Sequence, residues 1–379
     1  MKYLTPLKSK NLSNKICLLR VDFNIKEDKT INKNPRFLNA VNTIKLLNNS
    51  GSKVVVLSHR GRPNTTQKLK NSKTESKNVL SLKPFVKKLS TTLKKPIYFI
   101  DLFDENLKEK IKKSKPGSVF LLENLRFYPG EDKNDKNFAK KIAGLGDFYV
   151  NDAFAFSHRK TASMAAITDF LPSYAGPNLE NEINHLNNAL KKYKKPLVII
   201  LGGIKISDKL GLIKNFFSKA DYFLIGSAMA NNFLVAQELP IGDSVYEKEM
   251  VPFAKNFLKS GKIVLPIDFA VQNRKILDIG GKTEKQFTDI IKKAKTIIWN
   301  GPVGRFEIPK FAKGTQTIIE AILKNKNAKV VIGGGETLAA ISKYQSVISK
   351  NKNIFVSTGG GAMLEYLSGK KLPGIETLK

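Results

Sequence analysis

Residues 197–210 read LVIILGGIKISDKL, and this pattern decides the fold of the second half of the chain. Five apolar residues typical of a buried strand are followed by a Gly-Gly turn and then by a segment with the spacing of a helix. Strands that alternate with helices predict a parallel sheet. Four further segments repeat the design: YFLIGSAMANNF (222–233), TIIWNGPVGRFE (296–307), KVVIGGGETLAA (329–340) and NIFVSTGGGAMLEYL (353–367).

The first half of the chain shows the same alternation, with polar clusters in place of the glycines. We expect strands at Lys15 to Val21, Lys53 to Leu57, Ile97 to Ile100, Ser118 to Leu122 and Phe148 to Val150. The sequence therefore predicts an α/β protein with two doubly wound, Rossmann-like parallel-sheet domains.

The segment from Leu171 to Pro177 interrupts this alternation and marks the expected boundary. An amphipathic helix is expected to follow over Leu179 to Tyr193 as a connector. We therefore predict an N-terminal domain over 1–172, and a hinge, connector helix and C-terminal domain over 173–369. On the connector helix His185 is expected to be structural. A long mobile loop is expected over Asn64 to Asn78.

Arginine is scarce in this chain and is concentrated in its first half. Lysine and arginine together number 65, and eight of them are arginine. A guanidinium holds a carboxylate or phosphate through two parallel hydrogen bonds, which an ammonium cannot do. Ligands of open α/β sheets bind beyond the carboxyl ends of the strands, so the arginines predict a site for a small anion there; ordinary ion pairs are the alternative. The arginines singled out for this site are Arg20, Arg36, Arg62, Arg126 and Arg159.

The glycine-rich turns of the second half predict a nucleotide site. Glycine lets the backbone approach a ligand closely, and the free N–H groups at a helix start bind phosphate. One Gly-Gly pair is more often a simple turn, but five such units favour a nucleotide.

Composition limits the other classes of function. The net charge of +33 is typical of a nucleic-acid binder, but the lysines are spread along the chain and no nucleic-acid-binding motif is present, so we do not expect that partner. The single cysteine, Cys17, lies in an apolar run and is expected to be buried and unpaired. No uncharged stretch approaches the length of a membrane span, and the expected location is the cytoplasm.

Eight motifs, in order and over essentially the whole chain, resemble those of phosphoglycerate kinases. The resemblance implies a monomeric enzyme that transfers a phosphoryl group between 1,3-bisphosphoglycerate and ADP, giving 3-phosphoglycerate and ATP, with Mg²⁺. It also implies that the tail, 370–379, returns to the N-terminal domain. The motifs are RVDFN (20–24), SHRGRP (58–63), LLENLRF (121–127), NDAFAFSHR (151–159), GGIKISDK (202–209), WNGPVGRFE (299–307), GGGET (333–337) and STGGGA (357–362).

The same resemblance assigns residues to the phosphoglycerate and to the migrating phosphoryl group. Arg36 and Lys205 would stabilise the charge on that group, with help from Lys209 and from backbone N–H groups near Gly335 and Gly359 to Gly361. No general base is expected, because the attacking phosphate oxygen of ADP is already ionised. The residues that would bind the phosphoglycerate are Asp22, Asn24, Arg36, His59, Arg62, Arg126 and Arg159.

The nucleotide residues follow from the second set of motifs. Glu307 would bind the ribose. Glu336 stands where the family usually has Asp, and its longer side chain would hold Mg²⁺ directly, through water or only in the closed state. Lys26 and the GSAMA segment (226–230) are two further departures from the family pattern. The residues expected to contact the nucleotide are Lys205, Lys209, Asn300, Glu307, Gly334, Gly335, Glu336 and Thr337.

Two other functions stay open at this point. A kinase for a different acid would keep the nucleotide half but would not use 3-phosphoglycerate. A nucleic-acid binder without enzymatic activity would bind with a steep dependence on salt.

Overall fold

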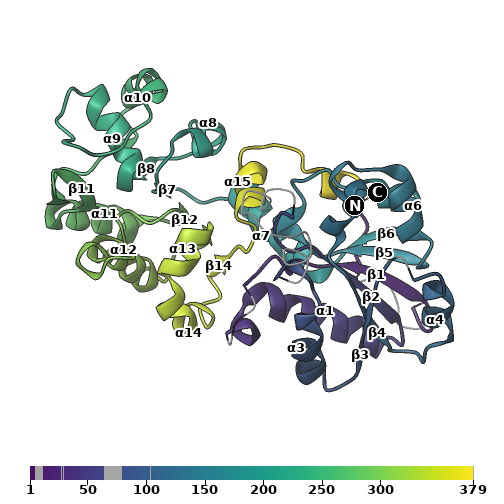
Figure 1. Ribbon diagram of the computed structural model, residues 1–379. Coiled ribbons are helices and arrows are strands. Elements are labelled where there is room, and N and C mark those ends of the chain that lie inside the picture. The colour runs from purple at the N-terminus through teal and green to yellow at the C-terminus, as the bar shows by residue number, and fades with distance from the viewer. Residues whose placement is uncertain (5–11, 27, 29, 64–78, 103, 379) are drawn as a thin grey trace. The chain divides into compact units, whose positions relative to one another are not determined.

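The structure, a computed structural model, describes residues 1–4, 12–26, 28, 30–63, 79–102 and 104–378. The chain divides into two compact units, Met1–Ile183 with Lys371–Lys379 and Asn184–Lys370. Each unit contains a six-stranded parallel sheet flanked by helices (Figure 1). The predicted pair of doubly wound α/β domains is therefore confirmed. Within the described part of the chain, no helix is long and apolar enough to cross a bilayer.

The first sheet has the strand order β3-β4-β2-β1-β5-β6. The ends of the five strands expected in this half differ from the prediction by at most one residue. The strands are β1 (Ile16–Arg20), β2 (Lys53–Leu57), β3 (Ile97–Ile100), β4 (Val119–Leu122), β5 (Phe148–Asn151) and β6 (Ser173–Ala175), and the α-helices of the unit are α1 (Pro35–Asn49), α3 (Pro84–Leu93), α4 (Leu107–Lys113), α5 (Pro129–Asp132), α6 (Lys136–Ala143), the start of α7 (Pro177–Lys191) and α16 (Pro373–Glu376).

The central strands of this sheet are buried on both faces, as parallel strands covered by helices are. Every residue of β1 and β2 is buried, including Cys17, as predicted. Phe23, just beyond β1, stacks on Phe85 of α3 with ring centroids 5.0 Å apart and lies 6.0 Å from Phe37 of α1. This aromatic group fixes the helices over the sheet and places the carboxyl end of β1 at the edge where the polar loops gather.

The second sheet has the order β14-β13-β12-β7-β8-β9 and the same parallel design. Its core includes Trp299, which is fully buried in β12. The strands are β7 (Leu197–Leu201), β8 (Tyr222–Ile225), β9 (Ile263–Val264), β12 (Thr296–Asn300), β13 (Lys329–Gly333) and β14 (Ile354–Val356), with a separate antiparallel pair, β10 (Phe269–Gln272) and β11 (Lys275–Ile279). The helices are α8 (Leu210–Phe216), α9 (Ser227–Ala236), α10 (Val251–Leu258), α11 (Gly281–Lys293), α12 (Lys313–Lys324), α13 (Gly335–Ala340), α14 (Gln345–Ile348) and α15 (Gly361–Leu367).

The boundary region differs from its prediction. Ser173–Ala175 is not an interruption but strand β6, which pairs with β5. The connector helix α7 begins at Pro177, two residues earlier than expected, because proline suits the first turn of a helix. The division between the units then falls after Ile183, inside α7, and not at 172, because the first turns of α7 are bound to the first unit.

Both ends of the described chain lie on the first unit (Figure 1). At the N-terminus, Leu4 N donates to Ala175 O at 3.0 Å. At the C-terminus, Gly374 N donates to Ser157 O at 2.9 Å, and the side chain of Asn151 donates to Gly374 O at 2.7 Å. The loop expected over 64–78 lies outside the described residues.

Candidate active site

The polar loops predicted to bind an anion follow four strands that are neighbours in the first sheet, β4, β2, β1 and β5. The order reverses at β1, which pairs with β2 on one side and β5 on the other. Ligands of doubly wound sheets bind at such a switch point. The predicted residues are placed after β1 (Asp22, Asn24), after β2 (His59, Arg62), in the first turn of α1 (Arg36), after β4 (Arg126) and after β5 (Arg159).

Direct contacts join three of these loops. Arg36 Nη1 lies 3.1 Å from Asp22 Oδ2. Gly61 N, in the loop after β2, donates to Asn24 Oδ1 at 3.0 Å, and Gly61 O accepts from Arg126 Nη1 at 2.7 Å. The loops after β1, β2 and β4 therefore form one connected cluster.

His59 is the buried member of this cluster. Its side chain is 2% exposed, and its ring packs on Phe156 with centroids 4.1 Å apart. Burial and the charges of Arg20, Arg126 and Arg36 hold the pKa of His59 well below its ordinary value. His59 is therefore a neutral hydrogen-bonding group near pH 7 and not a cation.

Phe156 supports the cations as well as the histidine. The guanidinium carbons of Arg20 and Arg126 lie 4.9 Å and 5.1 Å from the centre of its ring, within range of a cation–π interaction. Arg159 is exposed, and its backbone N–H donates to Phe156 O at 3.0 Å. Arg62 is exposed and follows Gly61 directly. These two residues lie beside the cluster in the chain.

The second unit carries a pocket of about 350 Å³ at the carboxyl ends of β7, β12, β13 and β14. Seven of the predicted residues line it, and all but Lys205 and Lys209 come from the end of β12, the turn after β13 and the first turn of α13. The order of the sheet reverses between β7 and β12, so this pocket too lies at a switch point. The predicted residues in its lining are Lys205, Lys209, Asn300, Gly334, Gly335, Glu336 and Thr337.

Two lysines supply positive charge to this pocket. Lys205 is exposed, whereas Lys209 is 8% exposed. Burial lowers the pKa of Lys209 from its ordinary value, and the carboxylates of Asp208, Glu336 and Glu247 oppose this effect. A partly desolvated cation beside carboxylates is suited to a phosphate chain that carries metal.

Asn300 and Thr337 hold the glycine loop in shape. The Asn300 amide donates to Gly333 O at 2.9 Å, and Thr337 Oγ1 accepts from Gly301 N at 2.7 Å. Gly334 has a φ of 102°, a conformation that favours glycine, and a Cβ there would lie 2.8 Å from Asn300 Nδ2. The loop before α13 therefore requires glycine at this position.

The predicted glycine run over 359–361 divides between two positions. The N–H of Gly359 donates to Ser357 Oγ at 3.1 Å, so this group holds its own loop. The next two glycines, Gly360 and Gly361, line the pocket instead. The run of three glycines in the sequence does not indicate that Gly359 is bound to Ser357 while its two neighbours line the pocket.

A second pocket of about 550 Å³ shares Gly203, Ile204 and Glu336 with the first. Glu307 lines it, as expected of a residue near a nucleoside. Sequence reasoning missed the part of this wall that comes from residues 244–245 and from β11. Asn273, whose φ of 48° fits the tight turn between β10 and β11, was the available signal for this hairpin.

The surroundings of Glu336 fit a magnesium ion that arrives with a nucleotide. Among the described residues, no group of three or more His, Cys, Asp or Glu side chains is able to hold a metal alone. Mg²⁺ is usually held by one or two carboxylates together with substrate phosphates and water. Glu336 is exposed, and it lines both pockets next to Lys209 and Gly203.

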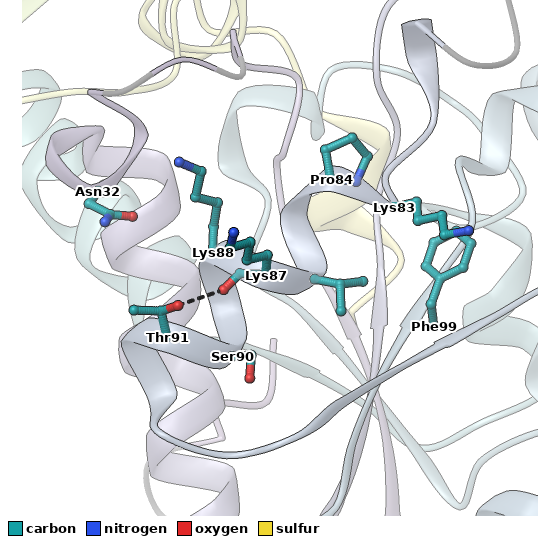
Figure 2. Close-up of a pocket in the computed structure, with 9 residues that line it drawn as sticks. Asn32, Lys83, Pro84, Lys87, Lys88, Ser90, Thr91 and Phe99 are labelled. Carbon is teal, nitrogen blue, oxygen red and sulfur yellow. Dashed lines mark hydrogen bonds between the residues drawn. The ribbon is translucent and has the colours of Figure 1, made fainter.

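A third hollow, of about 840 Å³, lies around α3 and contains none of the predicted residues. Figure 2 shows Lys87, Lys88 and Thr91 on one side of this helix and Lys83 with Phe99 on the other. The Thr91 hydroxyl donates to the backbone of its own helix, at Lys87 O. These groups do not converge on one point, so this hollow is not a candidate site.

Comparison with known proteins identifies the family. The model of the family "Phosphoglycerate kinase" matches residues 7–370. This chain belongs to the phosphoglycerate kinase family. It is 41% identical to the phosphoglycerate kinase of Dictyoglomus turgidum and 42% identical to that of Pseudothermotoga lettingae, each over 100% of this chain and 99% of the relative.

Solved structures agree with this result. A phosphoglycerate kinase from Coxiella burnetii superposes with a TM-score of 0.83 at 35% identity, over 99% of this chain and 98% of the other. One from Pyrococcus horikoshii gives a TM-score of 0.83 at 32% identity, over 100% and 98%. The predicted family, and with it a glycolytic kinase that phosphorylates a carboxyl group, is confirmed.

Proposed function

We propose that the chain converts 1,3-bisphosphoglycerate and ADP into 3-phosphoglycerate and ATP, with the acid on the first unit and the nucleotide on the second. Two features support this division of labour. The first unit gathers arginines and a neutral histidine at one sheet edge, and the second gathers glycine turns and lysines around a pocket. We also propose that the enzyme is a cytoplasmic monomer.

The residues of the first unit hold the acid by charge and by directed hydrogen bonds. Arg36, Arg62, Arg126 and Arg159 neutralise its phosphate and carboxylate groups. Asp22 accepts from the substrate hydroxyl and keeps Arg36 in position through the 3.1 Å ion pair. Asn24 and His59 contribute neutral hydrogen-bonding groups.

The residues of the second unit hold the nucleotide. The adenosine lies in the larger pocket near Glu307, and the phosphates lie in the smaller pocket against Lys209 and the loop that contains Gly334 and Gly335. Asn300 and Thr337 keep that loop open. Mg²⁺, bound with the nucleotide, would be held by Glu336 and would neutralise charge on the phosphates.

Catalysis by these residues consists of positioning and electrostatics. The migrating phosphoryl group carries charge on its equatorial oxygens, and Arg36 and Lys205 offer donors to those oxygens. The attacking oxygen of ADP has no proton to lose, so no side chain serves as a base. Since the donor and the acceptor are bound by different units, transfer requires hinge motion, for which we propose residues 172–177 and α7.

A coupled turnover assay with purified protein, ATP, Mg²⁺ and 3-phosphoglycerate tests the proposed function. We expect turnover with 3-phosphoglycerate and none when acetate replaces it, because acetate lacks the phosphate that the arginines bind. Equal turnover with the two acids would contradict the proposed substrate. The family match over residues 7–370 carries the proposal. The arginine cluster at the carboxyl ends of the strands in the first unit and the pocket lined by Gly334 and Gly335 in the second unit support it.

A further inference from the structure

Arg20 is a fully buried cation that contacts His59 in the cluster formed by the loops after β1, β2 and β4. It is the last residue of β1, and its side chain is 0% exposed. A buried charge is costly unless it is paired and hydrogen-bonded. Because its side chain is fully shielded from solvent, Arg20 cannot bind the acid in the way proposed for Arg62 and Arg159, which are exposed.

The contacts of Arg20 determine which nitrogen of His59 carries a proton. Arg20 Nη2 lies 2.9 Å from His59 Nδ1. A guanidinium has donors and no acceptor, so Nδ1 must accept this hydrogen bond. A neutral His59 then carries its proton on Nε2, and Nε2 is a donor. The burial and neighbouring charges that lower the pKa of His59 keep it in this neutral form.

The other side of Arg20 is fixed by Ser163 and Glu131, which are both fully buried. Arg20 Nε donates to Ser163 Oγ at 2.9 Å, and Ser163 Oγ donates to Glu131 Oε1 at 2.6 Å. The order of donors is unambiguous, because an arginine cannot accept and a carboxylate cannot donate. Glu131 also accepts from Ser163 N at 3.0 Å, and Arg20 Nη1 donates to Val21 O.

We propose that Arg20 is a positioning residue, held by Ser163 and Glu131, that locks His59 in the tautomer with Nε2 protonated so that it donates a hydrogen bond to the acid substrate. The inference rests on the proposed role of His59 in binding that substrate. The carboxylate of Glu131 balances the buried guanidinium. The ring of Phe156, 4.1 Å from that of His59, fixes the plane of the imidazole.

The tautomer of His59 tests this proposal without any assay of turnover. The chain has three histidines, so long-range ¹H–¹⁵N spectra are simple to assign with the variants His158→Gln and His185→Gln. At neutral pH we expect His59 to show an unprotonated Nδ1 and a protonated Nε2. A proton on Nδ1 would overturn the proposal, whether or not the protein proves to be active.

Variants then test the consequence for the substrate. Arg20→Gln is expected to mix the two tautomers and to raise the KM for 3-phosphoglycerate about tenfold, equivalent to about 1.4 kcal/mol, while the KM for ATP is unchanged. Ser163→Ala should give a smaller change in the same direction. Ser52→Ala is the matched control, because it removes a buried hydroxyl at the other end of β2.

A folded Arg20→Gln protein with an unaltered His59 tautomer and an unaltered KM for 3-phosphoglycerate would show that Arg20 only stabilises the hydrophobic core. Equal increases in both KM values would also overturn the positioning role. If neither variant folds, the tautomer measured in the wild-type protein decides. Absence of turnover in the wild type, with His59 in the expected tautomer, would instead count against the proposed function.

Discussion

Asp152 binds the start of the connector helix through both the backbone and the side chain of Asn178. Asp152 Oδ1 accepts from Asn178 N at 2.8 Å, and Asp152 Oδ2 accepts from the Asn178 amide. Leu179 N adds a bond to Oδ1 at 3.2 Å, and the Thr43 hydroxyl donates to Oδ2 at 2.6 Å. A carboxylate at the first turn of a helix also complements the helix dipole. This node attaches α7 to the first sheet.

The titration of Asp152 predicts a pH dependence of stability. Burial raises the pKa of Asp152 to about 6, although its hydrogen bonds oppose the shift. The native protein therefore binds this proton more tightly than the unfolded chain, whose Asp pKa is about 3.9. The stability contributed by protonation is full below about pH 4 and is lost as the pH rises through about 6, by up to about 3 kcal/mol.

The difference in the free energy of unfolding between wild type and Asp152→Asn isolates this titration. We expect the stability of the wild type relative to the variant to fall between about pH 4 and pH 6. Denaturant unfolding at a series of pH values measures it. A difference that stays constant over this range would show that Asp152 does not titrate there.

Lys205 and Arg36 should matter more for turnover than for binding. We propose that they stabilise the negative charge on the migrating phosphoryl group, and this stabilisation is needed most in the transition state. Removing one such donor costs about a hundredfold to a thousandfold in rate. Lys205→Ala and Arg36→Ala are therefore expected to lose kcat by about that factor, with ADP affinity little changed. Lys214→Ala, an exposed lysine on α8, is the control. Near-normal kcat in both site variants would refute these roles.

Gly334 should be required for nucleotide binding. An alanine there has to adopt a φ of 102°, and its Cβ would lie 2.8 Å from the Asn300 amide that holds the loop. A strained backbone of this kind costs about 1–2 kcal/mol. Gly334→Ala should therefore weaken ADP binding about tenfold in calorimetry.

Gly261→Ala is the matched control for this glycine. Gly261 also has a positive φ, 68°, but no atom lies within 4 Å of its Cβ position. The control also requires a positive φ but meets no neighbouring atom, and it should leave ADP binding intact. Equal losses in the two variants would mean that the effect arises from general destabilisation.

Hinge motion predicts a response that depends on both ligands together. Small-angle scattering of the protein with ADP and 3-phosphoglycerate should give a smaller radius of gyration than with either ligand alone, because a closed form has to exclude water during transfer. Identical profiles in all four states would contradict the hinge.

Strands buried on both faces were predictable because they appear as uninterrupted apolar runs. KVVVL at 53–57, in which every residue is buried, has the predicted bounds. The edge strand IYFI at 97–100 also has the predicted bounds, although Tyr98 in it is exposed. β6 and β9 were missed because they contain three and two residues, and Pro172 and Pro266 lie next to these short runs. Such strands form by pairing with a neighbour, which no local pattern indicates.

The positions of candidate residues were predictable where they follow a strand directly, as with His59 after β2. The buried residues that hold these side chains in place were not predictable. Arg20 was visible as an arginine at a strand end, but its burial depends on Ser163, which is 143 positions away, and on Glu131. The hydrogen bond from Gly359 N to the hydroxyl of Ser357 is likewise not indicated by the sequence.

A crystal structure with 3-phosphoglycerate and ADP bound tests the central claim most directly, that two units of one chain hold the acid and the nucleotide separately. We predict density for the acid against Asp22, His59 and Arg126, and density for the ADP phosphates against Lys209 and Gly334. Both ligands on one unit, or either ligand bound away from these residues, would contradict the claim.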